Sequence, residues 1–404
     1  MLEGIAYVDG GVLAPQGFLA AGVSAGLKRS GKRDVAVIAA QDRCPTAAVF
    51  TRNAMAAAPV LVSREHVADG HARAVVVNAG NANACTGERG RADAQAMAEA
   101  AAAALGCGPQ DVLVASTGVI GVPLPVDLVI AGIKEAVERL DVIGGDAVAE
   151  AIMTTDTFPK QVAVRIEVDG RAYAVGGVAK GSGMIRPDMA TMLAFITTDA
   201  PLDPRACDAA LRQAVEVTFN RVTVDSDTST NDTCVLMASG AAGGAAITPD
   251  DARFAPVAVA IEYVCGELAR MIARDGEGAT KLITVTVTGA RDESDAKRAA
   301  FAIAESPLVK TAVFGGDANW GRVAMAIGKS GAALDPSRVR IVFAGVLTCE
   351  NGTAVPFSEE EAARALSGPE VEIVADLGAG EASATVWTCD LTYEYVRING
   401  EYRS

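Results

Sequence analysis

The sequence predicts a mixed α/β protein with two or three lobes, and three observations support this fold class. A chain of 404 residues is longer than one ordinary hydrophobic core requires. In the first third, apolar runs of strand length at 35–40, 74–77 and 111–115 alternate with helical patterns at 91–105 and 126–140. Hydrophobic residues make up 50% of the chain and charged residues 21%, which is typical of a folded globular protein.

The pattern changes in the middle of the chain, where apolar side chains recur with period two. Residues 162–168 alternate, and the Asp169-Gly170 pair that follows is typical of a tight hairpin turn, so a β-hairpin is expected. A Gly-rich loop is expected from Gly176, and a strand is expected to begin at Thr191. Other expected elements are a loop at 78–84, helices near 203–217, 253–274, 293–304 and 358–366, and strands near 232–238, 281–288, 338–345, 370–375 and 383–391.

The composition bounds the function classes. Mean hydropathy is positive, but no run approaches about 18 uninterrupted apolar residues, so no membrane-spanning helix is expected. The first four residues contain an acid and no basic segment, unlike a signal peptide, and we expect a cytoplasmic protein. A net charge of −15 argues against nucleic acid and anionic membranes as partners. An anionic substrate would have to be held by a local Lys or Arg.

Cysteine and histidine usage narrows the chemistry further. The eight cysteines include no C-x-x-C pair, so we expect buried reduced thiols rather than a zinc site or disulfides. His66 and His71 are the only histidines, and we interpret both as surface residues near a loop, with no metal site. An enzyme with this sequence would therefore use a general base other than histidine.

Thr191 follows a segment that suits self-cleavage. Gly-rich backbone precedes it, Pro187 fixes a backbone angle just upstream, and the small residue Ala190 comes directly before it. A hydroxyl beside a strained peptide bond can attack the carbonyl of that bond, and hydrolysis of the ester leaves a free α-amine. That amine, with a reference pKa of roughly 7.7–8.0, can serve as base for the Thr191 hydroxyl. An ordinary junction between a loop and a strand explains the same residues, so this pattern alone leaves both interpretations open.

Longer segments carry a resemblance to a known family. The run at 180–199, KGSGMIRPDMATMLAFITTD, resembles the signature of the glutamate N-acetyltransferase family of arginine biosynthesis, also called the ornithine acetyltransferase family. The segments 115–121, 224–232 and 315–322 resemble further signatures of this family, and so does the end of the sequence at 399–404. The likeness extends over nearly the whole chain.

The resemblance implies a fold, a division of the chain and an assembly. The expected fold is a layered α/β/β/α sandwich of the ornithine acetyltransferase/DmpA type, similar to N-terminal-nucleophile enzymes, with a smaller C-terminal α/β lobe. The precursor is expected to cut itself between Ala190 and Thr191 into an α chain, 1–190, and a β chain, 191–404. Two copies of each piece would form an α2β2 heterotetramer.

The resemblance also implies an activity and its residues. Thr191 would take an acetyl group from N-acetylornithine, release ornithine and pass the acetyl group to glutamate in a ping-pong reaction. The expected oxyanion donors are Thr117 and Gly118, placed by sequence in a loop between a strand and a helix. Substrate contacts are expected at Thr154, Lys180, Thr191, Glu277, Asn399 and Ser404.

The charges of these residues suit amino-acid substrates, since Lys180 can bind a carboxylate and Glu277 an ammonium group. Asp156 lies close to Thr154 in the sequence, and we interpret it as a cap or a solvated acid. No cofactor is expected. Whether acetyl-CoA serves as a second acetyl donor is left open.

The chain departs from the usual family pattern at Arg186 and Asp188 beside the cleavage site, at Ser226 where Gly is usual, and at Ser404 where Thr is usual. Arg186 and Asp188 could change the rate of cutting, and the turn at Ser226 could differ. Two alternatives stay open: a self-processing amide hydrolase or aminopeptidase that uses water as acceptor, and an uncleaved binding protein without enzymatic activity.

Overall fold

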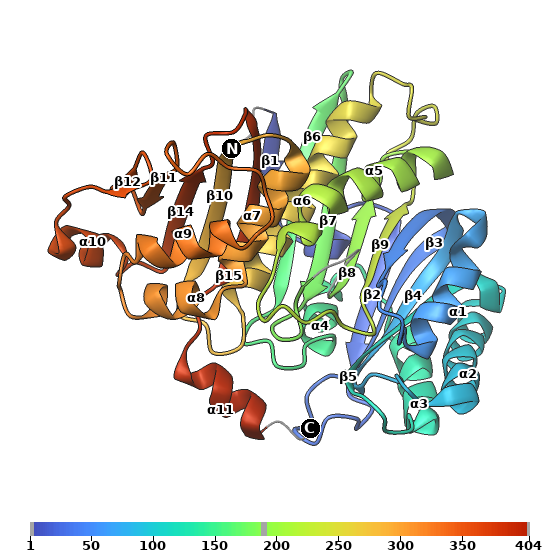
Figure 1. Ribbon diagram of the computed structural model, residues 1–404. Coiled ribbons are helices and arrows are strands. Elements are labelled where there is room, and N and C mark those ends of the chain that lie inside the picture. Colours follow the sequence, from blue (N-terminus) through green and yellow to red (C-terminus); the bar gives the residue numbers. More distant parts are fainter. Residues whose placement is uncertain (1–3, 187–191, 402–404) are drawn as a thin grey trace.

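The computed structural model describes residues 4–186 and 192–401, which form a large lobe and a smaller C-terminal lobe (Figure 1). The large lobe is built on a nine-stranded sheet and the smaller lobe on a six-stranded sheet. Within the described part of the chain, no helix is long and apolar enough to cross a membrane.

Within these ranges, the large lobe contains nine strands and six α-helices. The strands are β1 (Ile5–Tyr7), β2 (Phe18–Val23), β3 (Val35–Phe50), β4 (His71–Asn81), β5 (Val112–Val119), β6 (Lys160–Val168), β7 (Arg171–Lys180), β8 (Leu193–Thr198) and β9 (Thr233–Ala238). The helices are α1 (Ala58–His66), α2 (Gly87–Leu105), α3 (Val126–Glu138), α4 (Gly145–Ala151), α5 (Pro204–Val217) and α6 (Phe254–Arg274). The strand order is β1-β6-β7-β8-β9-β3-β4-β5, and β2 pairs with β3.

The long strand β3 belongs to both halves of this sheet. Its first part pairs with β2 and β4, and its last part, from Thr46, pairs with β9. The register between β3 and β4 shifts between Ala39 and Cys44, as at a β-bulge. Such an irregularity bends a strand, which allows the two halves of the sheet to face each other.

Side-chain alternation shows that both faces of the strands are buried. Leu193 and Phe195 of β8 pack with Val75 of β4 in one core between the two halves of the sheet. Ala194 and Ile196 point the other way, into the core beneath α5 and α6. The helices α1, α2 and α3 cover the opposite outer face, with α1 and α2 over β5 and α3 over β2 and β3. The order of layers is therefore α/β/β/α, and the predicted sandwich is confirmed.

The C-terminal lobe has its own sheet and its own core. Its strands are β10 (Leu282–Ala290), β11 (Arg340–Phe343), β12 (Val346–Glu350), β13 (Thr353–Ala354), β14 (Glu370–Asp376) and β15 (Ala382–Cys389), in the order β13-β12-β11-β14-β10-β15. Its helices are α7 (Glu293–Ala304), α8 (Pro307–Phe314), α9 (Trp320–Gly328) and α10 (Glu359–Ala365). The last helix, α11 (Tyr393–Glu401), extends away from this lobe toward the lower edge of the large lobe (Figure 1).

The long elements agree with the sequence predictions, but three predicted loops are wrong. β4 continues to Asn81, β5 continues to Val119, and β7 runs through the expected Gly-rich loop to Lys180. Glycine explains the last error, because a Cβ at Gly176 would lie 1.9 Å from the carbonyl oxygen of Gly11. Glycine here allows a strand to pass close to its neighbour rather than to turn. The expected start of a strand at Thr191 lies outside the described residues.

All eight cysteines and both histidines lie within the described residues. All eight cysteines are free, and all are buried except Cys85, which is exposed, and Cys107, which is partly exposed. The Nδ1 atoms of His66 and His71 each lie within hydrogen-bond distance of a backbone carbonyl. No group of three or more potential metal ligands lies together within residues 4–186 and 192–401.

Candidate active site

A cavity of about 170 Å³ lies where the ends of several large-lobe strands meet α11. Six of the residues predicted from the sequence line it: Thr117, Gly118, Thr154, Lys180, Glu277 and Asn399. Met192 lines the same cavity, and Thr191 directly precedes Met192 in the sequence. Ala190, Thr191 and Ser404 themselves lie outside the described residues, so the structure does not place them.

Thr117 and Gly118 lie within strand β5 rather than in the predicted loop. Parallel pairing with β4 continues past the expected end, with Gly118 opposite Gly80. Gly118 has a φ of +133°, and a Cβ at this position would lie 2.3 Å from the backbone carbon of Gly80. Only glycine permits this conformation and this approach. The backbone of β5 can therefore line the cavity directly.

Asn231 fixes the peptide that precedes Thr117. Its side-chain amide donates hydrogen bonds to the carbonyl oxygens of Ser116, at 2.9 Å, and Ala82, at 2.6 Å. The carbonyl of Ser116 and the N–H of Thr117 belong to one planar trans peptide and point in opposite directions. Asn231 therefore sets the direction of the Thr117 N–H. Sequence reasoning placed Asn231 in a family signature but gave it no role.

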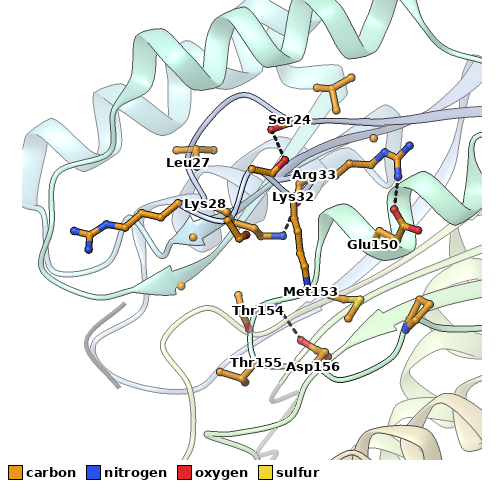
Figure 2. Close-up of a pocket in the computed structure, with 18 of the residues that line it drawn as sticks. Ser24, Leu27, Lys28, Lys32, Arg33, Glu150, Met153, Thr154, Thr155 and Asp156 are labelled. Carbon is orange, nitrogen blue, oxygen red and sulfur yellow. Dashed lines mark hydrogen bonds and ion pairs between the residues drawn. The ribbon is translucent and has the colours of Figure 1, made fainter. Parts of the chain in front are cut away.

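Lys180 is held at the other side of the cavity by Thr154 and Asp156. Its ammonium donates to the Thr154 hydroxyl at 2.7 Å and lies 3.8 Å from a carboxylate oxygen of Asp156. Asp156 accepts hydrogen bonds from the backbone N–H groups of Thr154 and Gly181 (Figure 2 draws the first of these). The interpretation of Asp156 as a cap or solvated acid is wrong, because its side chain is fully buried.

Asp156 is one end of a buried chain of charges that the sequence did not reveal. Lys160, whose side chain is 0% exposed, donates to Asp156 at 2.7 Å and to Asp275 on its other side. Asp275 in turn accepts hydrogen bonds from the backbone and hydroxyl of Thr157. Burial alone would raise the pKa of Asp156, but Lys180 and Lys160 beside it hold that pKa well below its usual range.

Glu277 approaches the cavity across the loop that follows β7. Its backbone N–H donates to the carbonyl of Ser182 at 3.0 Å, and its carboxylate accepts a hydrogen bond from Asn399 of α11 at 2.8 Å. A Cβ at Gly183 would lie 2.4 Å from the Glu277 carboxyl carbon. Glycine in this loop therefore makes room for Glu277, and the pair brings the end of α11 to the cavity.

Asp232 also lines the cavity and was missed by sequence reasoning. Its side chain is buried, and its Oδ2 atom has no hydrogen-bond partner among the described residues. Burial raises the pKa of Asp232 well above its usual value, which favours the protonated form of this carboxyl group. A buried carboxylic acid in this position can donate a proton or a hydrogen bond into the cavity. Sequence reasoning placed Asp232 at the end of the family signature 224–232, directly before the apolar strand β9, but gave it no role.

Two departures from the family pattern can be located. Ser226 has a φ of +70°, so the turn keeps the left-handed conformation that favours glycine. Asp225 beside it accepts hydrogen bonds from the N–H groups of Met184 and Ile185. Arg186 pairs with Glu305 of the C-terminal lobe at 2.6 Å. Asp188 lies outside the described residues.

Gly118→Ala is expected to destabilise the protein and to abolish most activity, because the added methyl group meets the backbone of β4. Gly121→Ala is the matched control, since Gly121 also has a positive φ, of +81°, but a Cβ added there would have no atom within 4 Å. Both variants carry a conformational cost of about 1–2 kcal/mol, and only Gly118→Ala adds the clash. Urea denaturation and an acetyl-transfer assay measure the two effects. Equal losses in both variants would show that the close approach of the strands is unimportant.

The fold and the cavity together indicate an enzyme that acts on an amino-acid substrate. The two halves of the nine-stranded sheet lie face to face between helical layers, and at the ends of their strands a small cavity combines backbone groups of β5 with a lysine and a glutamate that suit an amino-acid substrate. The chain belongs to the ArgJ family, whose model matches residues 19–404.

Individual relatives agree with this assignment. The chain is 54% identical over 400 residues to the arginine biosynthesis bifunctional protein ArgJ of Symbiobacterium thermophilum, covering 98% of this chain and 100% of the relative. It is 50% identical over 401 residues to the protein of the same name from Caldanaerobacter subterraneus, covering 98% and 99%. The crystal structure of arginine biosynthesis bifunctional protein ArgJ from Bacillus halodurans matches with 46% identity and a TM-score of 0.50, covering 51% of this chain and 97% of that chain. The predicted family and enzyme class, an acyltransferase of arginine biosynthesis, are confirmed.

Proposed function

We propose that this chain transfers an acetyl group from N-acetylornithine to glutamate through an acetyl ester on Thr191, with ornithine and N-acetylglutamate as products. The observation that carries the proposal is the gathering of six predicted residues, from distant parts of the chain, around one cavity next to Met192. A cavity of about 170 Å³ suits the reacting end of an amino-acid substrate.

Each lining residue has a chemical task in this proposal. The Lys180 ammonium binds the α-carboxylate of the substrate, and Glu277, positioned by Asn399, binds an ammonium group. The Thr191 oxygen attacks the acetamide carbonyl, the C–N bond breaks, and ornithine leaves with the proton on its amine. The amine of glutamate then attacks the ester, the C–O bond breaks, and the proton returns to Thr191. The backbone N–H groups of Thr117 and Gly118 stabilise the oxyanion of both steps, and each such donor contributes about 2.7–4 kcal/mol.

The proposal includes self-cleavage at Ala190-Thr191, which supplies the α-amine that serves as base. The half-length solved chain from Bacillus halodurans supports it, because nearly all of that chain matches only half of this one, as expected for one piece of a cut precursor. Lys160 and Asp275 would then lie in different pieces, 1–190 and 191–404, and their buried ion pair would help to hold the pieces together. An α2β2 heterotetramer and a cytoplasmic location belong to the same proposal.

Freshly purified protein is expected to give two bands on a denaturing gel. Cutting after Ala190 yields pieces of 190 residues and, by subtraction (404 − 190), 214 residues. N-terminal sequencing of the larger piece should read Thr-Met-Leu-Ala-Phe. A single full-length band would remove the self-cleavage step and favour the uncleaved binding protein. Ornithine release that does not depend on glutamate would favour the amide hydrolase.

A further inference from the structure

The cavity beside Met192 contains one titratable side chain that the proposed reaction leaves without a task. Within the described residues, three such side chains line it: Lys180, Asp232 and Glu277. Lys180 and Glu277 have substrate groups to bind, and Asp232 has none. Asp232 is 1% exposed, and its buried Oδ2 atom has no hydrogen-bond partner among the described residues. Leaving a buried acceptor unpaired costs about 1–3 kcal/mol, so a partner for this atom is expected.

Asp232 belongs to the strand that pairs with the one following Thr191. Strands β8 and β9 run parallel with Leu193 opposite Thr233, and the Thr233 N–H donates to the carbonyl of Met192 at 2.9 Å. Asp232 directly precedes Thr233, at the start of β9. Thr191 directly precedes Met192. An α-amine created on Thr191 by self-cleavage would therefore begin one residue from the strand pair that carries Asp232.

The surroundings of Asp232 favour its protonated form. Burial raises its pKa well above the usual value, and the positive charge of Lys180 opposes this shift only in part. The side chains of Ser229 and Thr51 lie beside the carboxyl group. The Thr51 hydroxyl donates its single proton to the carbonyl of Ser229 at 2.8 Å, so toward Asp232 it can only accept. A protonated carboxyl group can donate to this acceptor and keep its other oxygen free.

We infer that Asp232 is a positioning residue whose carboxyl group accepts a hydrogen bond from the α-amine of Thr191 and turns the lone pair of this amine toward the Thr191 hydroxyl. The inference rests on the proposed function, because the amine exists only after self-cleavage. In the first half-reaction, the amine takes the hydroxyl proton and gives it to the leaving nitrogen of ornithine. In the second, it takes a proton from the attacking nitrogen of glutamate and returns it to the Thr191 oxygen. Asp232 neither gains nor loses a proton in this cycle.

A neutral acid suits this task better than a carboxylate. A negative charge beside the amine would favour the ammonium form, which has no lone pair to take the hydroxyl proton. The reference pKa of an α-amine is roughly 7.7–8.0, so a further rise would leave little free base near neutral pH. A carboxyl group kept neutral by burial can accept the hydrogen bond without this effect.

Asp232→Asn and Asp232→Leu test the inference as a pair of variants of similar size. Asparagine reproduces the protonated acid, because its NH2 group can donate to Thr51 and its oxygen can accept from the amine, whereas leucine can do neither. Both variants should still cut, because the amine does not exist before cutting. With N-acetylornithine and glutamate, kcat should fall by about 10²-fold in Asp232→Leu and by less than about tenfold in Asp232→Asn. Both KM values should stay within about twofold of wild type, since Lys180 and Glu277 are unchanged.

Asp199→Leu is the control for the loss of a buried acid outside the cavity. Asp199 directly follows β8, at the end of the strand away from Met192, and is 3% exposed. It accepts hydrogen bonds from the backbone N–H groups of Gln16 and Ala174 and does not line the cavity. This variant should unfold at lower urea concentration, and the kcat of its folded form should stay within about twofold of wild type.

Each of three results would overturn the inference. Equal losses of kcat in Asp232→Asn and Asp232→Leu would show that the reaction needs the charge or the proton of the acid and not an acceptor. An unchanged kcat in Asp232→Leu would show that the amine needs no such partner, and a folded Asp232→Leu chain that stays uncut would place the role of the carboxyl group before the amine exists. If Asp232→Leu does not fold, a loss of about 10²-fold in kcat for folded Asp232→Asn overturns the inference alone. Wild type that cuts and transfers acetyl would show in each case that the proposed function still stands.

Discussion

Thr191→Ala is expected to leave the chain uncut and to reduce acetyl transfer by about 10⁴-fold or more, because the substitution removes the oxygen to which we assign both self-cleavage and acetyl transfer. In the first reaction, this oxygen attacks the carbonyl of Ala190. In the second, it attacks the acetyl group of the substrate. No other side chain in the described cavity combines a hydroxyl with a neighbouring amine that self-cleavage creates.

Thr191→Ser is the matched variant, since it keeps the hydroxyl and loses only a methyl group. It should still cut, more slowly, and should retain measurable transfer. The gel reports cutting, and mass spectrometry of the larger piece after incubation with N-acetylornithine should show one added acetyl group in wild type and none in Thr191→Ala. An active Thr191→Ala enzyme would exclude Thr191 as the nucleophile.

The fold was predictable from the sequence where the signal is local. Period-two alternation at 162–168 and the Asp169-Gly170 turn correspond to β6 and the turn into β7. The ends of β4, β5 and β7 were not predictable in this way, because Gly80, Gly118 and Gly176 are typical of loops. Gly118 approaches the backbone of Gly80 and Gly176 approaches that of Gly11, so the role of these glycines depends on partners far away in the sequence.

The candidate site, like the fold, was predictable from the sequence only in part. Resemblance to the family predicted Lys180 and Glu277, and the structure places both on one cavity. It did not predict the buried role of Asp156, because no local pattern distinguishes a buried acid from a solvated one. Lys160 links Asp156 to Asp275, which lies in the C-terminal part of the chain. A link between residues so far apart in the sequence is visible only in the folded structure.

Lys160→Met is the second variant with a large expected effect, because it removes the shared cation from a fully buried network. Asp156 and Asp275 would then lose their closest positive charge at sites that are 0% and 2% exposed. Breaking a buried ion pair from one side costs about 3–5 kcal/mol, a large part of the roughly 5–15 kcal/mol by which a typical domain is stable. Arg212→Met is the matched control, since its pair with Asp208 is about half exposed on both sides and should contribute no more than about 1 kcal/mol.

The loss of Lys160 should also weaken substrate binding, because Asp156 positions both Thr154 and Lys180. At a temperature where the variant is folded, the KM for N-acetylornithine and for glutamate should rise together. A variant that loses only stability would keep both KM values, and that result would limit the network to a structural role.

The pH dependence of the unfolding free energy distinguishes the contribution of the charge interaction between Lys160 and Asp156 from that of ordinary side-chain packing. The folded pKa of Asp156 lies below its unfolded value of about 3.9, so its contribution is complete above that pH and is lost as the pH falls toward the folded value. Lys160→Met removes one cause of the low pKa, so the variant has less of this contribution to lose. The difference in unfolding free energy between wild type and variant should therefore narrow below about pH 4. A difference that stays constant from about pH 7 to about pH 3 would mean that the variant lost packing around the Lys160 chain and not the interaction between its charge and Asp156.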